Sequence, residues 1–250
     1  MSFHTGALAT LILALTLSGC DSGGGSAAPD GSQPDAVADA VLEDTGPDAA
    51  SDAGVDTAPS PDTQGVDPRW PDPAEVGARS VLDPAAVGFF ELPFPFDLRR
   101  HADGRPDLTG FPNPFDLAVV DSYVEPIEAV VDGFSPAGTV YLRFDAPLDP
   151  DAFPTPEQTT TLDGDVVLAS ITPSSPTYGI PVPVEMSYYG GTPPKEGYYL
   201  QPYLLMVKPL QGFPLREGEK YVLIVRRELE DAEGRLLGAA ELLERILKGE

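Results

Sequence analysis

Residues 139–144 read TVYLRF, and they carry the alternation of side chains that a half-buried β-strand requires. Val140, Leu142 and Phe144 fall on one face of such a strand, because successive side chains point to opposite sides of the backbone. A tyrosine and an arginine fall on the other face. The segment therefore predicts a strand that has one face in an apolar core.

Four further segments are mainly apolar, are separated by turn signals and are strand candidates as well. They are 166–171 (VVLASI), 182–188 (VPVEMSY), 204–208 (LLMVK) and 221–226 (YVLIVR). Their spacing predicts a mainly β chain, an antiparallel β-sandwich. A hairpin turn at 230–234, with Gly234 in a left-handed position, should return the chain into residues 235–237.

Two segments have helical spacing instead. In residues 115–131 the apolar side chains recur at intervals of three and four. They are Leu117, Val120, Val124, Ile127, Val130 and Val131. Pro126 should end or kink the helix, so we expect one bent helix or two short ones. Residues 239–247 present an apolar stripe that either docks on the sandwich or begins a region that continues beyond this chain.

The charge of the chain is strongly negative and unevenly placed. Its 250 residues carry a formal net charge of -25, and the first lysine or arginine is Arg69. Eleven of the 40 acidic residues precede Arg69. Such a polyanion repels nucleic-acid phosphates and anionic lipid, so we expect no nucleic-acid partner and no electrostatic attraction to membranes.

The N-terminal sequence has the pattern of an export signal. The apolar run at 7–17 (ALATLILALTL) is too short to span a bilayer, but it has the length of a signal-peptide core. The run ends in LSGC, residues 17–20, which resembles the bacterial lipobox, in which the cysteine is diacylated and becomes the mature N-terminus. We therefore predict a lipoprotein signal peptide at 1–19 and lipidation at Cys20, the one cysteine of the chain.

Residues 20–75 consist mainly of Asp, Ala, Pro, Gly and Ser. Positions 22–68 contain no aromatic residue, so this segment cannot bury enough apolar surface to offset the entropy of ordering it. The composition predicts a disordered tether. The folded domain is predicted at 76–237, and the C-terminal helical segment occupies 238–250.

Residues 90–114 (FELPFPFDLRRHADGRPDLTGFPNP) concentrate phenylalanines and prolines. The prolines hold the chain extended without ladder hydrogen bonds, and the phenylalanines can plug the core where the tether enters. Asp103 and Gly104 favour a turn between the two aromatic arms. The stretch predicts a structural clasp, which consists of Phe94, Pro95, Phe96 and Phe111.

His101, one of two histidines, is the candidate for catalysis in this stretch. A nucleophile–His–acid arrangement needs a positioned nucleophile, and the chain has no G-x-S-x-G elbow. The chain also has neither H-E-x-x-H nor paired Cys-x-x-Cys motifs, so its motifs give zinc no support. We expect His101 in a solvated loop and no catalytic residue in this chain.

No cofactor is predicted, and calcium is the alternative. The candidate ligands are Asp145, Asp149 and Asp151, then Asp163 and Asp165, then Asp231 and Glu233. None of these groups has the spacing of an EF-hand loop, and Asp-Gly turns need no metal. A tyrosine-rich region offers either an aromatic ligand surface or, more commonly, strand-edge packing. Its members are Tyr188, Tyr189, Tyr198, Tyr199 and Tyr203.

Several short motifs together resemble the N-terminal domain of bacterial surface lipoprotein lipases and related exported α/β-hydrolases. They are PFPFDL at 93–98, VDGFS at 131–135 followed by the strand at 140–144, PLD at 147–149, KPL at 208–210, LREGEKY at 215–221 and LEDAEG at 229–234. The last three motifs, at 208–210, 215–221 and 229–234, are also similar to those of bacterial Ig-like domains. The resemblance covers residues 90–237 and implies an Ig-like β module that precedes a hydrolase domain absent from this chain.

These observations combine into one expectation. The chain is predicted to be an exported lipoprotein of the bacterial cell envelope, with the outer membrane or cell surface favoured over the inner membrane. Its β-sandwich module is predicted to be non-catalytic and to serve a downstream or separate hydrolase domain. The alternatives are a stand-alone binding or adhesion module, with or without calcium, and a hydrolase whose catalytic domain lies outside this chain.

Overall fold

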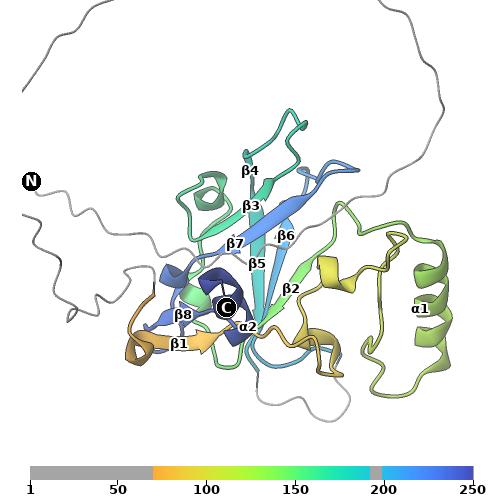
Figure 1. The fold of residues 1–250 in the computed structure, drawn as a ribbon, viewed down its shortest axis with the longest axis horizontal. Helices are drawn as coiled ribbons and strands as arrows, with labels where there is room; N and C mark the ends of the chain where they lie inside the picture. The colour runs from red at the N-terminus through yellow and green to blue at the C-terminus, as the bar shows by residue number, and fades with distance from the viewer. Residues whose placement is uncertain (1–69, 192–198, 250) are drawn as a thin grey trace, which may run out of the picture. The chain divides into compact units, whose positions relative to one another are not determined.

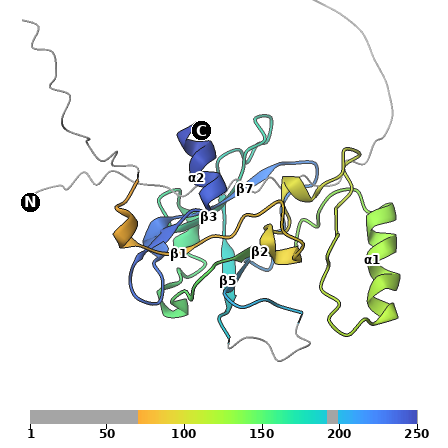
Figure 2. The same ribbon diagram turned by 60° about the horizontal axis from the view of Figure 1, so that its bottom comes forward.

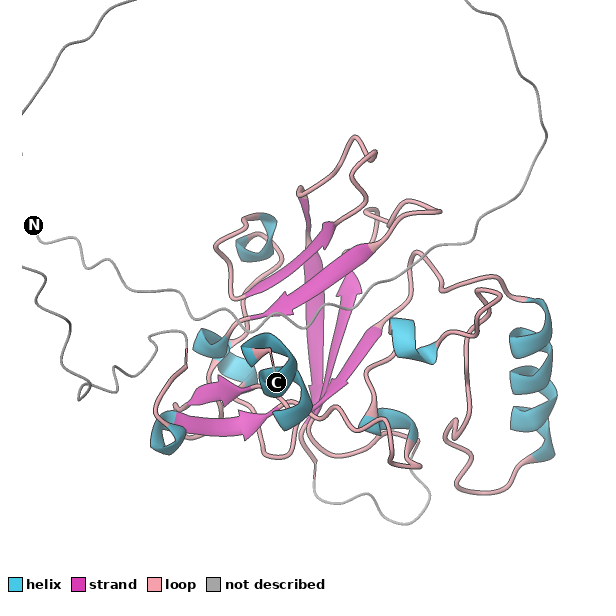
Figure 3. Ribbon diagram, in the orientation of Figure 1, coloured by secondary structure: helices cyan, strands magenta, loops and turns pink. Residues whose placement is uncertain are grey.

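A computed structural model describes residues 70–191 and 199–249 of the chain. Strands form the centre of this part, and helices lie around them (Figure 3). The strands are β1 Val76–Arg79, β2 Val140–Arg143, β3 Val166–Ser170, β4 Pro181–Val182, β5 Val184–Tyr189, β6 Leu204–Pro209, β7 Tyr221–Val225 and β8 Leu236–Gly238. The α-helices are α1 Ala118–Val130 and α2 Glu241–Lys248. Short 3-10 helices span Pro73–Glu75, Phe89–Glu91, Asp97–Arg99, Pro150–Ala152, Gln158–Thr160 and Arg227–Leu229.

Six of these strands form two antiparallel sheets, ordered β2-β6-β5 and β4-β3-β7 (Figure 1). The strand predicted at 139–144 is β2, and its Leu142 lies opposite Leu205 of β6. The segment predicted as one strand at 182–188 is divided between β4 and β5, which pair with β3 and β6 respectively. The division falls at Pro183, whose nitrogen cannot donate a ladder hydrogen bond.

One apolar core draws side chains from both sheets. Val140, Leu142 and Phe144 are at most 1% exposed, as the alternation in TVYLRF predicts. They share this core with residues of β3, β6 and β7, including the fully buried Leu223. The mainly β class is therefore confirmed, while an Ig-like sandwich arrangement stays a prediction.

The predicted hairpin after residue 230 forms its turn but does not return to the neighbouring strand. Gly234 has a φ of 72°, and its N–H donates to the Asp231 carbonyl at 3.0 Å. The strand that follows, β8, then pairs with β1 in parallel, from the other end of the domain sequence. The predicted turn is therefore present, and the Asp231 N–H closes it by donating to the Arg235 carbonyl at 2.9 Å, but the strand that follows pairs with β1 instead of with the segment before the turn.

The helix predicted at 115–131 is a single one, α1, with Pro126 inside it. Figures 1 and 2 place α1 and the β1–β8 pair on opposite sides of the two sheets. No residue of α1 is buried, and Tyr123 and Val130 are 68% and 79% exposed. The apolar stripe in the sequence is therefore only partly covered by the rest of the described chain.

The C-terminal helix α2 docks on the domain, one of the two outcomes expected for it. Leu243 packs against the main core, and the Glu244 carboxylate lies 3.0 Å from Nη1 of Arg79. Lys248 lies 4.7 Å from the ring centre of Trp70, which joins the first described residue to this helix. Among the described residues no helix is long and apolar enough to cross a bilayer.

Candidate functional site

The predicted clasp is built into the β domain at Phe94. Its backbone exchanges two hydrogen bonds with Tyr141 of β2, of 3.1 and 2.6 Å. Its ring lies 5.1 Å from Phe89 and 5.4 Å from Phe134, measured between centroids, so it touches both apolar clusters of the domain. The peptide bond between Phe94 and Pro95 is cis. Phe94 therefore links the loop to both the sheet and its core.

The other members of the clasp are placed unequally. Pro95 is buried and Phe96 packs against the main core. Phe111 is 41% exposed and meets the edge of Phe89 at 5.4 Å. The structure thus joins Phe94, Pro95 and Phe96 to the core and leaves Phe111 at its border.

A buried cation, Arg99, ties the two arms of the clasp together. Its guanidinium donates to the carbonyls of Thr109 and Phe89, at 2.9 and 2.5 Å, and lies 4.6 Å from the centre of the Phe89 ring. Burial lowers the pKa of Arg99, while the charge of Asp107 opposes that shift. Sequence reasoning missed this residue, because nothing in the pair Arg99-Arg100 distinguishes a buried arginine from a solvated one.

The predicted turn at Asp103-Gly104 closes the segment between the arms. Gly104 has a φ of 94° and donates its N–H to the His101 carbonyl at 2.9 Å. The His101 N–H in turn donates to the Arg105 carbonyl at 2.9 Å, and Arg105 pairs with Asp103 at 2.6 Å. His101 itself is exposed, as expected of a loop position.

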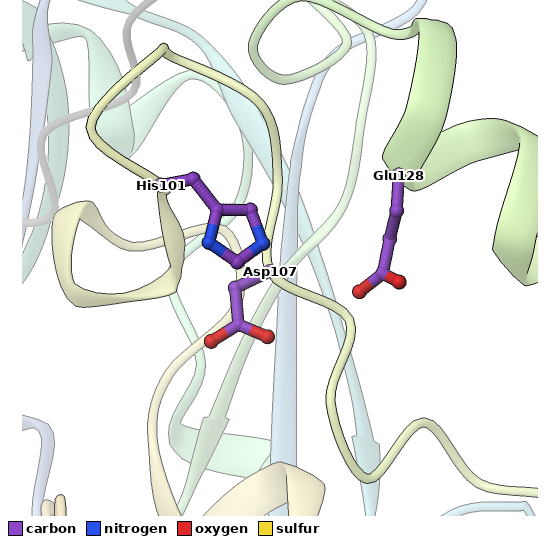
Figure 4. A group of neighbouring side chains, drawn as sticks. All are labelled: His101, Asp107 and Glu128. Atoms are coloured by element: carbon purple, nitrogen blue, oxygen red, sulfur yellow. The ribbon is translucent and has the colours of Figure 1, made fainter.

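Folding brings two carboxylates to this histidine. One potential ligand atom from each of His101, Asp107 and Glu128 lies within 4.8 Å of the other two (Figure 4). Asp107 follows the clasp turn, whereas Glu128 comes from α1. The motif search could not find this group, because its members are separated by up to 27 residues and meet only through the placement of α1.

Both carboxylates are oriented by backbone amides. Oδ1 of Asp107 accepts the N–H of Thr109 at 2.9 Å, and Oε1 of Glu128 accepts the N–H of Leu108 at 2.6 Å. Burial acts to raise the pKa of Asp107, but the Thr109 hydrogen bonds and the charges of Arg99 and His101 hold it below its usual value. Asp107 is therefore an anion at neutral pH, beside an imidazole and a second carboxylate.

An apolar hollow adjoins this group. It has a volume of about 310 Å³, and its wall runs from Phe94 and Pro106 to Ile127 of α1. Leu108 lines it as well, and the same residue donates its N–H to Glu128. The hydrogen bond between Leu108 and Glu128 thus fixes the position of α1 beside the hollow.

Four of the seven acids considered for calcium, Asp145, Asp149, Asp231 and Glu233, make side-chain contacts within the chain. Oδ1 of Asp145 accepts the N–H of Arg79 at 2.7 Å, and Oδ1 of Asp149 accepts that of Asp151 at 3.0 Å. The carboxylate of Asp231 accepts backbone N–H groups and pairs with Arg235 at 2.8 Å. Within 70–191 and 199–249, none of the acid groups proposed for calcium forms a cluster of three possible ligands.

The tyrosines mostly serve strand packing. The Tyr188 hydroxyl accepts the N–H of Leu148 at 2.9 Å, and both Tyr188 and Tyr203 pack against the main core. Tyr189 packs against the smaller apolar cluster, whereas Tyr199 is 39% exposed. Tyr198, Cys20, the signal peptide and residues 20–69 of the tether lie outside the described residues.

Comparison of the chain with models of protein families, with curated proteins and with solved structures gave no match.

Proposed function

We propose that this protein is an exported lipoprotein whose β domain is a non-catalytic module of the bacterial cell envelope. The observation that carries the proposal is the apolar run at 7–17 ending in LSGC, with Cys20 as the one cysteine of the chain. A diacylated Cys20 would hold the chain at a membrane surface. The lipid anchor is needed for this, because the net charge of the chain, -25, repels anionic lipid headgroups.

The acidic segment after Cys20 separates the anchor from the domain in this proposal. A flexible chain of its length has a root-mean-square reach of roughly 35–40 Å, and repulsion between its carboxylates extends it further. The β domain would then stand clear of the lipid headgroups, where it can position a partner.

The partner favoured by the proposal is a hydrolase domain, either downstream or on a separate chain. Support comes from the resemblance of residues 90–237 to the N-terminal module of exported lipases. Two motifs of that resemblance lie together in the described fold, since Phe94 of PFPFDL contacts Phe134 of VDGFS. Turnover of an ester by this chain that is lost in His101→Ala would contradict the non-catalytic part.

Cell fractionation with a lipid label tests the anchor. We expect the parent chain, fed an alkyne analogue of palmitate in a bacterial host, to carry the label and to sediment with membranes. Cys20→Ala should lose both properties, and Ser22→Ala, two residues away, should keep them. A Cys20→Ala protein that is still bound to membranes as fully as the parent would contradict the proposal.

A further inference from the structure

The group formed by His101, Asp107 and Glu128 has the chemistry of a transition-metal site. It offers one imidazole nitrogen and two carboxylates, and a potential ligand atom of each lies within 4.8 Å of the others. Imidazole together with carboxylate suits zinc and similar first-row ions, whereas calcium and magnesium prefer oxygen ligands alone. The two carboxylates also match the charge of a divalent ion.

The three ligand atoms need to move only slightly closer together to bind zinc. Zinc–nitrogen and zinc–oxygen bonds of about 2.0–2.2 Å place tetrahedral ligands roughly 3.3–3.5 Å apart. The ligand atoms here would therefore approach one another by about 1.5 Å at most. His101 is exposed and its ring can turn toward the carboxylates, while Asp107 and Glu128 are each oriented by a backbone N–H. Three protein ligands leave a fourth position for water.

The surrounding charges are compatible with a cation. The nearest buried guanidinium, that of Arg99, is directed to the carbonyls of Thr109 and Phe89. Arg105 pairs with Asp103 and also reaches the carbonyl of Ala129 at 3.4 Å. Both arginines thus make their hydrogen bonds to groups other than the carboxylates of Asp107 and Glu128, while the charge of Arg99 still acts on Asp107.

We propose that His101, Asp107 and Glu128 bind one divalent transition-metal ion of the zinc type, which fastens helix α1 to the loop of the clasp. Glu128 is the ligand from α1, and the other two come from the segment 101–107. Because α1 fully buries none of its side chains and Val124 alone packs on the smaller apolar cluster, a metal cross-link would add a strong contact where apolar packing is slight. The ion would hold Ile127 and Leu108 together across the apolar hollow.

Calorimetric titration with zinc chloride tests the site. The full chain carrying Cys20→Ala is the parent, because that change removes the lipid and the one thiol that could compete for metal. We expect one zinc ion bound at this group and a loss of affinity of at least about tenfold in His101→Ala and in Glu128→Gln. Glutamine keeps an oxygen for the Leu108 N–H, and Glu125→Gln, an exposed position of α1, is the matched control.

Amide hydrogen exchange gives a second readout, because it compares helix α1 of the parent chain with and without zinc. At free zinc 100 times its Kd, exchange within α1 should slow by up to about 100-fold in the parent, because opening the helix must release the metal. The slowing should be absent in His101→Ala. Unchanged zinc affinity in that variant, or zinc binding that leaves α1 exchange unaltered, would overturn the proposal.

Discussion

Asp231 shows how one side chain can decide the pairing of two strands. Its carboxylate is fully buried and accepts the N–H of Ala78 in β1 at 3.1 Å and that of Arg235 at 2.9 Å. A Cβ added at Gly77 would lie 1.7 Å from Oδ2 of Asp231, so the strand must carry a glycine there. Together these contacts bring β1 alongside the segment that enters β8.

The contribution of Asp231 to stability should depend on pH. Burial acts to raise its pKa, but hydrogen bonds from Arg235, Glu233 and Ala78 hold the pKa below its usual value. A carboxyl whose folded pKa is depressed stabilises the fold above its unfolded pKa of about 3.9. That contribution is lost as pH falls from there through the lower folded value.

Urea unfolding of the parent and of Asp231→Asn between pH 7 and pH 3 measures this effect. At pH 7 we expect the variant to lose about 2 kcal/mol, since a neutral amide replaces a buried carboxylate that accepts three backbone N–H groups. The difference should shrink as pH drops below about 4. Asp163→Asn, at an exposed position, should lose little at any pH. A difference for Asp231→Asn that is constant across the range would contradict the account.

At the scale of elements, the most informative signals in the sequence were the alternation of apolar and polar residues and the positions of the prolines. The pattern of TVYLRF identified β2 and its buried face, and the other strand segments were found near their true bounds. The partner of β8 could not be predicted, because it depends on Asp231 meeting β1 across 153 positions. The exposure of α1 could not be predicted either, since an apolar stripe at helical spacing does not determine how much of the helix the rest of the chain buries.

The clasp makes a quantitative prediction for two of its phenylalanines. Phe94→Ala should destabilise the domain by about 2–3 kcal/mol, because it empties a half-buried position between two apolar clusters. Phe111→Ala, at a position 41% exposed, should cost less than about 1 kcal/mol. Thermal or urea unfolding of both variants checks the order. Equal losses of stability, or a larger loss for Phe111→Ala, would contradict the claim that the clasp stabilises the core mainly through Phe94.

At the scale of the whole molecule, composition predicts a division between an acidic segment and a β domain, and the described residues belong to the second part. Residues 22–68 contain no aromatic residue and Trp70 is the first one after them, so a packed core is predicted only from about Trp70 onward. The candidate metal group was beyond such reasoning, because His101 and Glu128 become neighbours only after α1 is placed. The search for calcium relied on acids that are close in sequence, and the fold uses Asp145, Asp149 and Asp231 for backbone hydrogen bonds instead.

The central claim, that the chain is a lipoprotein anchored through Cys20, is tested most directly by mass spectrometry of the mature N-terminus. The full gene product is purified from the membranes of a bacterial host, and its N-terminal peptide is sequenced and weighed. The account predicts that the mature chain begins at Cys20 and that its sulfur carries a diacylglyceryl group. A mature protein that retains residues 1–19, or that carries an unmodified Cys20, would contradict it.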